Sequence, residues 1–185
     1  MSFAVYSAVD VALWFMDRAL DDNEYLQPQK LHRLLYLAQA YYGVAYHSRP
    51  LMPAIFIAEE LGPVEPNLFR LFEQMRPSLE RRRIPDSTAH FLDSIWRRFG
   101  QHSADHLSKV ITGHPPYKEA RLRGKLSEIP FEATVAFYAD PRGASRAETP
   151  AVEDVLRPRV LRSQTGKPVS VKAWLPSKAP TTPKK

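Results

Sequence analysis

The sequence contains no cysteine, and this absence removes several kinds of chemistry at once. A chain without thiols has no disulfide, no thiolate nucleophile and no cysteine-based zinc or iron–sulfur site. Glycine is also scarce, with seven residues, and the GxGxxG and GxxxxGKS/T loops that hold nucleotide phosphates do not occur. A GxSxG nucleophile elbow is missing too. We therefore expect a protein that is not an enzyme and that has no cofactor.

Long apolar runs are absent as well. No segment approaches the ~18 consecutive apolar residues of a membrane-spanning helix. Residues 1–6 lack the basic start of a secretory signal. The missing cysteines suit a reducing compartment. Together these features predict a cytoplasmic protein with no membrane partner.

The positive charge is not spread over the chain. The formal net charge is +6, yet residues 141–185 hold 10 of the 26 basic residues and only 3 of the 20 acidic ones, whereas the remainder is nearly balanced. The same segment contains seven of the 17 prolines. Such a composition disfavours a packed core. We expect a body at residues 1–140 that folds alone, followed by a basic, proline-rich and flexible tail at residues 141–185.

Within the body, apolar residues recur at helical spacing. The pattern predicts a mainly α, compact single-domain fold of about six helices, with a small extended or β insert. The expected helices cover residues 7–20, 28–45, a stretch beginning at Pro66, 87–99, 103–113 and 127–139, and a short helical turn follows residue 114. Residues 54–58 lie between prolines and are expected to be extended, with a turn at Gly62-Pro63.

Two groups of titratable side chains are candidates for a metal site or for an acid–base pair. His102 and His106 are four residues apart, so they would share a helix face that His114 could reach. Without an HExxH frame or a trio of carboxylates, we expect no metal site there. Glu59 and Glu60 are adjacent on an extended segment and would point to opposite faces, which does not suit a shared-proton pair. They are expected to be solvated or to face a partner.

The helix expected at residues 28–45 is crowded with aromatic rings. Its leucines form one apolar stripe typical of a core helix, and Lys30 and Arg33 are expected on the flank of that stripe. The four tyrosines that follow would not all fit inward beside such a stripe; they are Tyr36, Tyr41, Tyr42 and Tyr46. Tyrosine is favoured at the centres of interfaces. These rings either form a contact surface or pack on neighbouring elements with wet hydroxyls.

The ordered motifs of the chain resemble those of the Panacea domain, the family of SocA-like antitoxins and GepA-type phage-associated proteins. The resemblance is carried by "LQPQKLHRLLYLAQAYY", by "RPLMPAIFIAEELGPVEPNLFRLF", by "LSKVITGHPPYKEA" and by "SEIPFEATVAFYA". It spans residues 5–139. The chain departs from the family pattern at Arg33, which stands near a usual lysine, and at Tyr117, which replaces a usual tryptophan.

The resemblance implies an antitoxin that binds and neutralises a protein toxin, and that can act as an adaptor delivering the toxin to the ClpXP protease. No enzymatic activity comes with the family. The candidate toxin contacts are the polar and aromatic residues of the first two motifs: Lys30, Arg33, Tyr36, Tyr41, Tyr42, Tyr46, Glu59 and Glu60. The alternative is a DNA-binding transcriptional regulator that contacts nucleic acid through its basic tail.

The tail itself contains two short apolar clusters. The first lies in "VEDVLRPRVLRS", residues 152–163, and includes Val155, Leu156, Val160 and Leu161. Apolar patches with basic neighbours in a flexible chain suit docking peptides that become ordered only on binding. We expect these four residues to dock a second partner, with a ClpXP component as the candidate. The alternative is that they fold back onto the body or extend the toxin interface.

Overall fold

The computed structural model describes residues 2–72, 79–80, 82–140 and 149–156, together with the backbone of residues 160–162 and 168–170. In chain order the elements are α1 (Ala8–Asp21), α2 (Pro28–Ala45), β1 (Phe56–Glu59), β2 (Gly62–Val64), α3 (Pro66–Phe72), α4 (Asp86–Phe99), α5 (Ala104–Thr112), α6 (Pro115–Arg123), β3 (Glu128–Ile129), α7 (Phe131–Ala139), α8 (Val152–Val155), β4 (Val160–Arg162) and β5 (Pro168–Ser170). The predicted mainly α fold is confirmed. The described part holds two more helices than expected, because α6 is longer than a single turn and α8 lies in the expected tail.

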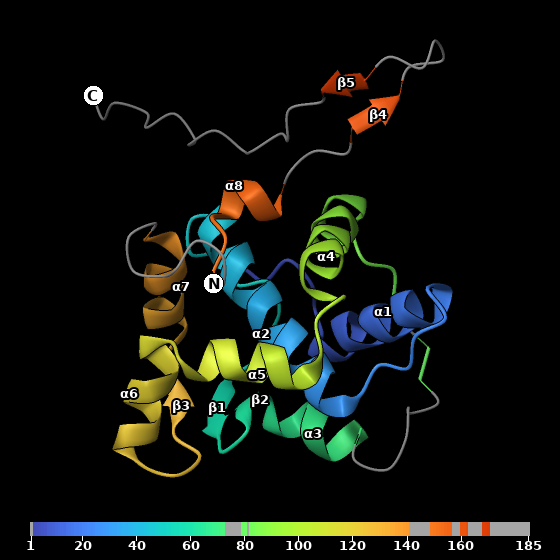
Figure 1. The fold of residues 1–185 in the computed structure, drawn as a ribbon. Coiled ribbons are helices and arrows are strands. Elements are labelled where there is room, and N and C mark those ends of the chain that lie inside the picture. Colours follow the sequence, from blue (N-terminus) through green and yellow to red (C-terminus); the bar gives the residue numbers. More distant parts are fainter. Residues whose placement is uncertain are drawn as a thin grey trace, which may run out of the picture.

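Helix α2 runs through the middle of the body, with α1, α4, α5 and α7 packed around it (Figure 1). Pro28 occupies its first turn, where the missing N–H costs nothing. Fifteen of its 18 residues are buried, so the helix is covered on every side and not along a single stripe. Helix α7 approaches it so closely that a Cβ at Gly43 would lie 2.4 Å from Val135 Cγ2. The packing at this contact therefore requires glycine.

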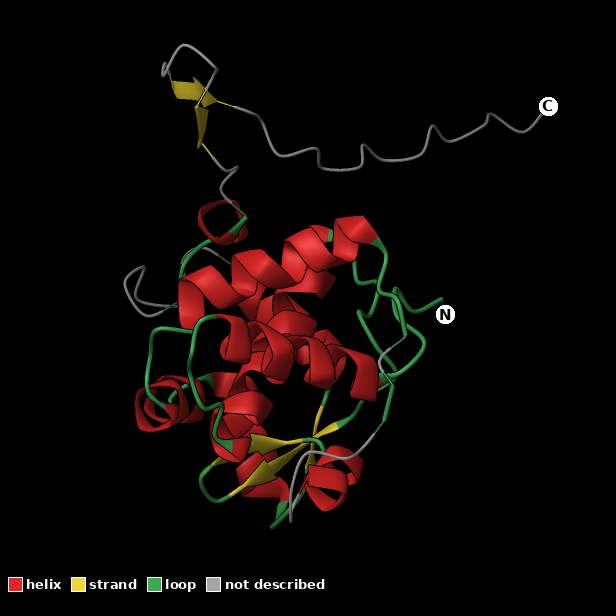
Figure 2. Cartoon of the chain, turned by 90° about the vertical axis from the view of Figure 1, so that its right-hand side faces the viewer, coloured by secondary structure: helices red, strands yellow, loops and turns green. Residues whose placement is uncertain are grey.

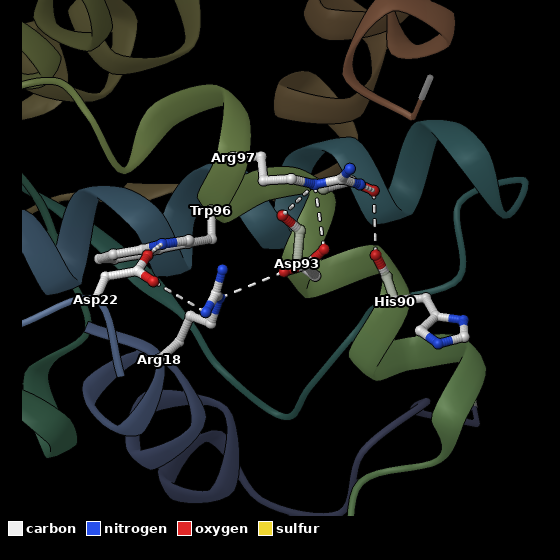
Figure 3. A network of polar contacts seen from close by, with 7 residues as sticks. Arg18, Asp22, His90, Asp93, Trp96 and Arg97 are labelled. Carbon is white, nitrogen blue, oxygen red and sulfur yellow. Dashed lines mark hydrogen bonds and ion pairs between the residues drawn. The ribbon is translucent and has the colours of Figure 1, made fainter. Parts of the chain in front are cut away.

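A polar network joins the end of α1 to α4 (Figure 3). The indole N–H of Trp96, a buried side chain, donates to Asp22 Oδ2 at 2.7 Å. The guanidinium of Arg18 lies 3.1 Å from Asp22 and 3.3 Å from Asp93, and Arg97 lies 3.1 Å from the other oxygen of Asp93. A buried indole needs a hydrogen-bond acceptor, and this network supplies one while fixing α1 against α4.

The expected extended insert is a small antiparallel sheet at one end of the helical body (Figure 2). Strands β1 and β2 form a hairpin, and β3 pairs with the other edge of β1. The turn lies at Glu60-Leu61, just before the predicted Gly62-Pro63 position, and Gly62 has φ +130°, which favours glycine. Because residues 128–129 pair with β1, helix α7 begins at Phe131, later than the predicted start at residue 127.

Residues 149–156 pack on the body, which corrects the expected boundary at Asp140. Helix α8 lies at the end of the body opposite the sheet and contacts α2 and α4 (Figure 1). Val155 is 4% exposed and belongs to the core, and Leu156 is half-buried against it. The prediction that Val155 docks a second partner is therefore wrong, and the fold-back alternative holds for it. The side chains of Val160 and Leu161 lie outside the described residues.

Across the described ranges, no helix has the length and apolar composition needed to cross a membrane.

Two truncations test the position of the boundary. A chain ending at Leu156 should keep the thermal midpoint of the full chain, whereas a chain ending at Asp140 should melt earlier. The shorter chain loses the burial of Val155 and the carbonyl partner of the Tyr41 hydroxyl, together worth about 2–4 kcal/mol. Thermal unfolding followed by circular dichroism measures the difference. Equal midpoints for the two truncated chains would show that residues 149–156 contribute nothing to the body.

Candidate functional site

Three of the four candidate tyrosines are core residues. Tyr36, Tyr41 and Tyr42 are at most 3% exposed, so the prediction that their rings form a contact surface is wrong. The error has a physical cause, because α2 has neighbours on both sides and inward space is not limited to its leucine stripe. The hydroxyl of Tyr36 lies 3.4 Å from Thr134 Oγ1, and that of Tyr41 donates to the carbonyl of Pro150 at 2.8 Å. Burial raises the pKa of Tyr36 to about 12.

Tyr46 differs from the other three because it caps the end of α2 and is half-buried. Its ring stacks on Tyr42 with centroids 4.1 Å apart and planes 17° from parallel, and the edge of Phe91 meets both rings. Tyr46 is thus the outer member of an aromatic stack and keeps part of its ring open to solvent.

Lys30 lies beside the leucine stripe but is buried, at 6% exposed, so the prediction that it contacts a toxin is wrong. Its ammonium donates to the carboxylate of Glu24 and to the carbonyl of Gly100, and it lies 5.6 Å from the centre of the Trp96 ring. These groups belong to the loop before α2 and to α4 with the residue that follows it. A buried cation is tolerated where it is paired and hydrogen-bonded. Lys30 therefore joins three segments of the body.

Arg33 is 1% exposed and donates mainly to the β1–β2 hairpin, so the prediction that it contacts a toxin directly is wrong. Nη1 donates to the carbonyl of Pro63 at 3.0 Å, Nη2 donates to the carbonyl of Leu61, and Nε donates to Ser108 Oγ at 3.0 Å. Burial lowers the pKa of the guanidinium, and Glu59 acts in the opposite direction. The planar, many-donor head of arginine suits this task, whereas lysine offers only one nitrogen.

The same turn is held from α6. Tyr117 donates its hydroxyl to the carbonyls of Glu59 and, at 3.3 Å, of Glu60. Arg121 donates to the carbonyl of Ala58 at 3.3 Å. Within the turn, the carboxylate of Glu59 accepts the N–H of Leu61 at 2.9 Å. Side chains from α2 and α6 thus fix a turn that lies on the surface.

The turn exposes a small surface that contains both acidic and apolar side chains. Glu60 is exposed, Glu59 is half-exposed and Leu61 is 55% exposed. These three residues, called the hairpin tip below, are the candidate functional site. Of the eight predicted contact residues, Glu59 and Glu60 come together there, while Lys30 and Arg33 lie beneath the surface. Tyr36, Tyr41 and Tyr42 lie elsewhere in the core, and Tyr46 is half-buried at the end of α2.

Three residues that hold the hairpin in place are not predicted by the sequence. Tyr117 and Arg121 donate to carbonyls of the hairpin, and Ser108 accepts from Nε of Arg33, yet all three are far from the hairpin tip in the chain. Ser108 and Tyr117 do belong to the "LSKVITGHPPYKEA" motif, so the order of motifs carried a signal. Arg121 lies one residue beyond the motif and gave no local sign of its role.

The three histidines do not form a metal centre in the described part of the chain, where no three metal-ligating side chains come together. The rings of His102 and His106 stack with centroids 4.5 Å apart. His114 uses both nitrogens, with Nδ1 3.1 Å from the hydroxyl of Tyr138 and Nε2 3.0 Å from Thr149 Oγ1. Burial lowers the pKa of His114 to about 4, so its ring is neutral near pH 7.

Replacing Arg33 tests whether its guanidinium positions the hairpin. Arg33→Lys should destabilise the fold by about 2–4 kcal/mol, because a lysine cannot satisfy the buried carbonyl of Pro63, the partly buried carbonyl of Leu61 and the hydroxyl of Ser108 together. Arg49→Lys is the matched control: Arg49 also makes three hydrogen bonds, but all are exposed, and the expected cost is under ~1 kcal/mol. Urea denaturation measures both. Equal costs would contradict the anchoring role.

No protein-family model, no curated protein and no solved structure matches this chain. The resemblance to the Panacea domain is therefore carried by the sequence motifs alone.

Proposed function

We propose that this protein is an antitoxin that binds and neutralises a protein toxin, with the hairpin tip at the centre of the contact. The observation that carries the proposal is that the tip is exposed and yet fixed from below by side chains of two helices. A surface that is already ordered loses little conformational freedom on binding, so more of its interaction energy becomes affinity.

The motifs of the antitoxin resemblance converge on this turn. The first motif supplies Arg33, the second supplies the hairpin with Gly62 and Pro63, and the third supplies Ser108 and Tyr117. All three segments build a single surface loop, although Arg33 and Tyr117 are positions at which the chain departs from the family pattern. This arrangement supports a binding role for the loop, because a surface turn can stay folded without hydrogen bonds from two helices.

The chemistry of the hairpin tip suits a partner with a basic rim around an apolar pocket. Leu61 offers an apolar side chain that a pocket could desolvate, and Glu60 beside it offers a carboxylate. Buried apolar anchors supply much of the affinity of an interface, and charges at its rim mainly set specificity and the association rate. We therefore assign Leu61 the anchoring role and Glu60 the steering role.

Substitutions at the hairpin tip test the proposal with the candidate toxin that co-purifies with the protein from native cells. Leu61→Ser should weaken toxin binding by at least about tenfold, ~1.4 kcal/mol, and Glu60→Lys should chiefly slow association. Both side chains leave the core unchanged, so the thermal midpoint should stay within about 1 °C of the parent. Surface plasmon resonance gives the rate constants.

Leu20→Ser is the matched control, because Leu20 is 62% exposed at the end of α1, away from the hairpin. It should bind the toxin as the parent does. Normal affinity of Leu61→Ser, or an equal loss in Leu20→Ser, would contradict the assignment of the hairpin tip.

Two more specific roles concern the residues after Leu156: a protease adaptor, which extends the proposal, and a DNA-binding regulator, which is the alternative to it. As an adaptor, the antitoxin would hold its toxin near ClpXP and raise the effective concentration of the substrate. As a DNA-binding regulator, it would use the basic charge concentrated in residues 141–185.

The chain ending at Leu156 separates these two forms. If the tail recruits the protease, this chain should still bind toxin but no longer promote its degradation by reconstituted ClpXP. If the tail binds operator DNA, the full chain should bind with an affinity that falls steeply with salt, and the truncated chain should lose that affinity. Degradation that proceeds unchanged, together with no DNA binding by the full chain, would remove both roles from the tail.

A further inference from the structure

A cavity of about 230 Å³ lies beneath the segment that precedes α8, at the junction of α2, α4, α5 and α7. Its inner walls are apolar and include Leu37, Phe99, Leu107 and Ile111. The hairpin tip and its anchoring side chains take no part in lining it. The cavity is therefore a feature separate from the site proposed for the toxin.

One corner of the cavity is basic. It is formed where α4 turns into α5 (Figure 1): Arg98 comes from the last turn of α4, His102 from the connecting turn and His106 from the first turn of α5. None of the described residues that line the cavity is acidic. The lining thus combines an apolar interior with a basic corner. These two parts are complementary to the apolar and charged ends of an amphipathic anion.

The electrostatics of this corner favour a negative ligand. The pKa of His102 is lowered, first by burial and then by the neighbouring His106, Arg98 and Lys30. The charge of Arg98 also reaches Tyr41, where it opposes the effect of burial on the tyrosine pKa. Lys30 has a partner in Glu24, so Arg98 supplies the main charge at the corner itself. An anion placed there would offset the positive charge of Arg98 and would favour protonation of His102.

The cavity is closed on one side by residues that are themselves held in place. Pro150 lines the cavity, and its carbonyl accepts the hydroxyl of Tyr41 at 2.8 Å. Thr149 contacts Nε2 of His114, whose other nitrogen contacts the hydroxyl of Tyr138. These contacts preform the walls, so a ligand would not have to build its own site.

We propose that this cavity binds a small aliphatic carboxylate, with the carboxylate against Arg98 and the two stacked histidines and the alkyl chain against Leu37, Phe99, Leu107 and Ile111. A guanidinium binds a carboxylate through charge-assisted hydrogen bonds. The volume is below the ~300–1,000 Å³ of sites for drug-sized ligands, which selects a short chain over a long-chain lipid. The site is independent of the toxin contact proposed above.

Isothermal titration calorimetry of the full chain with octanoate tests the proposal, with octanamide as the neutral probe of equal length. Octanoate should bind saturably with one site, and octanamide should bind about tenfold or more weakly, because it lacks the charge that Arg98 recognises. Octanoate affinity should also rise from pH 8 to pH 6. The bound anion favours protonation of His102, whose pKa is lowered by burial and by the neighbouring His106, Arg98 and Lys30. Burial keeps His114, Tyr41 and Tyr138 neutral over this range.

Three variants test which residues contact the carboxylate and which contact the alkyl chain of the ligand. Arg98→Gln, at an exposed position, should lower octanoate affinity about tenfold and leave octanamide unchanged. Val110→Trp, which fills the cavity from α5, should abolish the binding of both probes. Lys109→Gln removes an exposed cation beside Val110 that does not line the cavity, and it should bind both probes as the parent does.

Absence of saturable octanoate binding to the parent would overturn the proposal. Equal affinities for octanoate and octanamide, or an octanoate affinity unaffected by Arg98→Gln, would overturn the assignment of the basic corner. Because Arg98→Gln changes an exposed side chain, its result stands even if Val110→Trp fails to fold. Toxin binding by the same variants should be unchanged, which separates failure here from failure of the proposed antitoxin role.

Discussion

The guanidinium of Arg33 is the interaction on which the candidate site depends. It is a buried cation on the central helix, and its donors go to two carbonyls of a surface hairpin and to a hydroxyl on α5. Leaving such a group unpaired in the interior would be costly, so the hairpin has one position that satisfies it. Gly62 completes the arrangement, because a Cβ there would lie 2.7 Å from Arg33 Nε. The exposed residues at the hairpin tip are therefore oriented by a contact that solvent does not reach.

Buried hydrogen bonds also determine how the aromatic core is packed. Tyr36, Tyr41 and Tyr138 are buried, and each places its hydroxyl against a polar group from another segment. A purely apolar side chain could pack in several orientations, but a buried hydroxyl must find its hydrogen-bond partner. The tyrosine hydroxyls thus fix α7 and residues 149–150 relative to α2.

Local patterns in the sequence predict most of the helices. They do not predict which side chains become buried when the helices pack together. Pro28 at the start of α2, and Ser103 with Gly113 at the ends of α5, are signals contained within a few residues. The burial of Lys30 and Arg33 depends on carbonyls from distant segments, and no local pattern records that. Strand β3 was missed because two residues between proline and serine carry no periodicity. The apolar residues at 152–156 stand out in the sequence, but their partner surface on α2 and α4 is formed only by the tertiary structure.

The contact between Tyr41 and Pro150 spans 109 positions of the chain. Helix α2 is made early during synthesis, while the segment that covers one end of it is made late. Contacts of such long sequence separation slow folding and leave apolar surface uncovered in the meantime. A nascent chain that has already formed α2 and α4 therefore presents the groove for α8 to chaperones and proteases until the last part of the body has been translated. The interval between synthesis and completion of this contact therefore sets a lower limit on how quickly a new molecule buries this apolar surface.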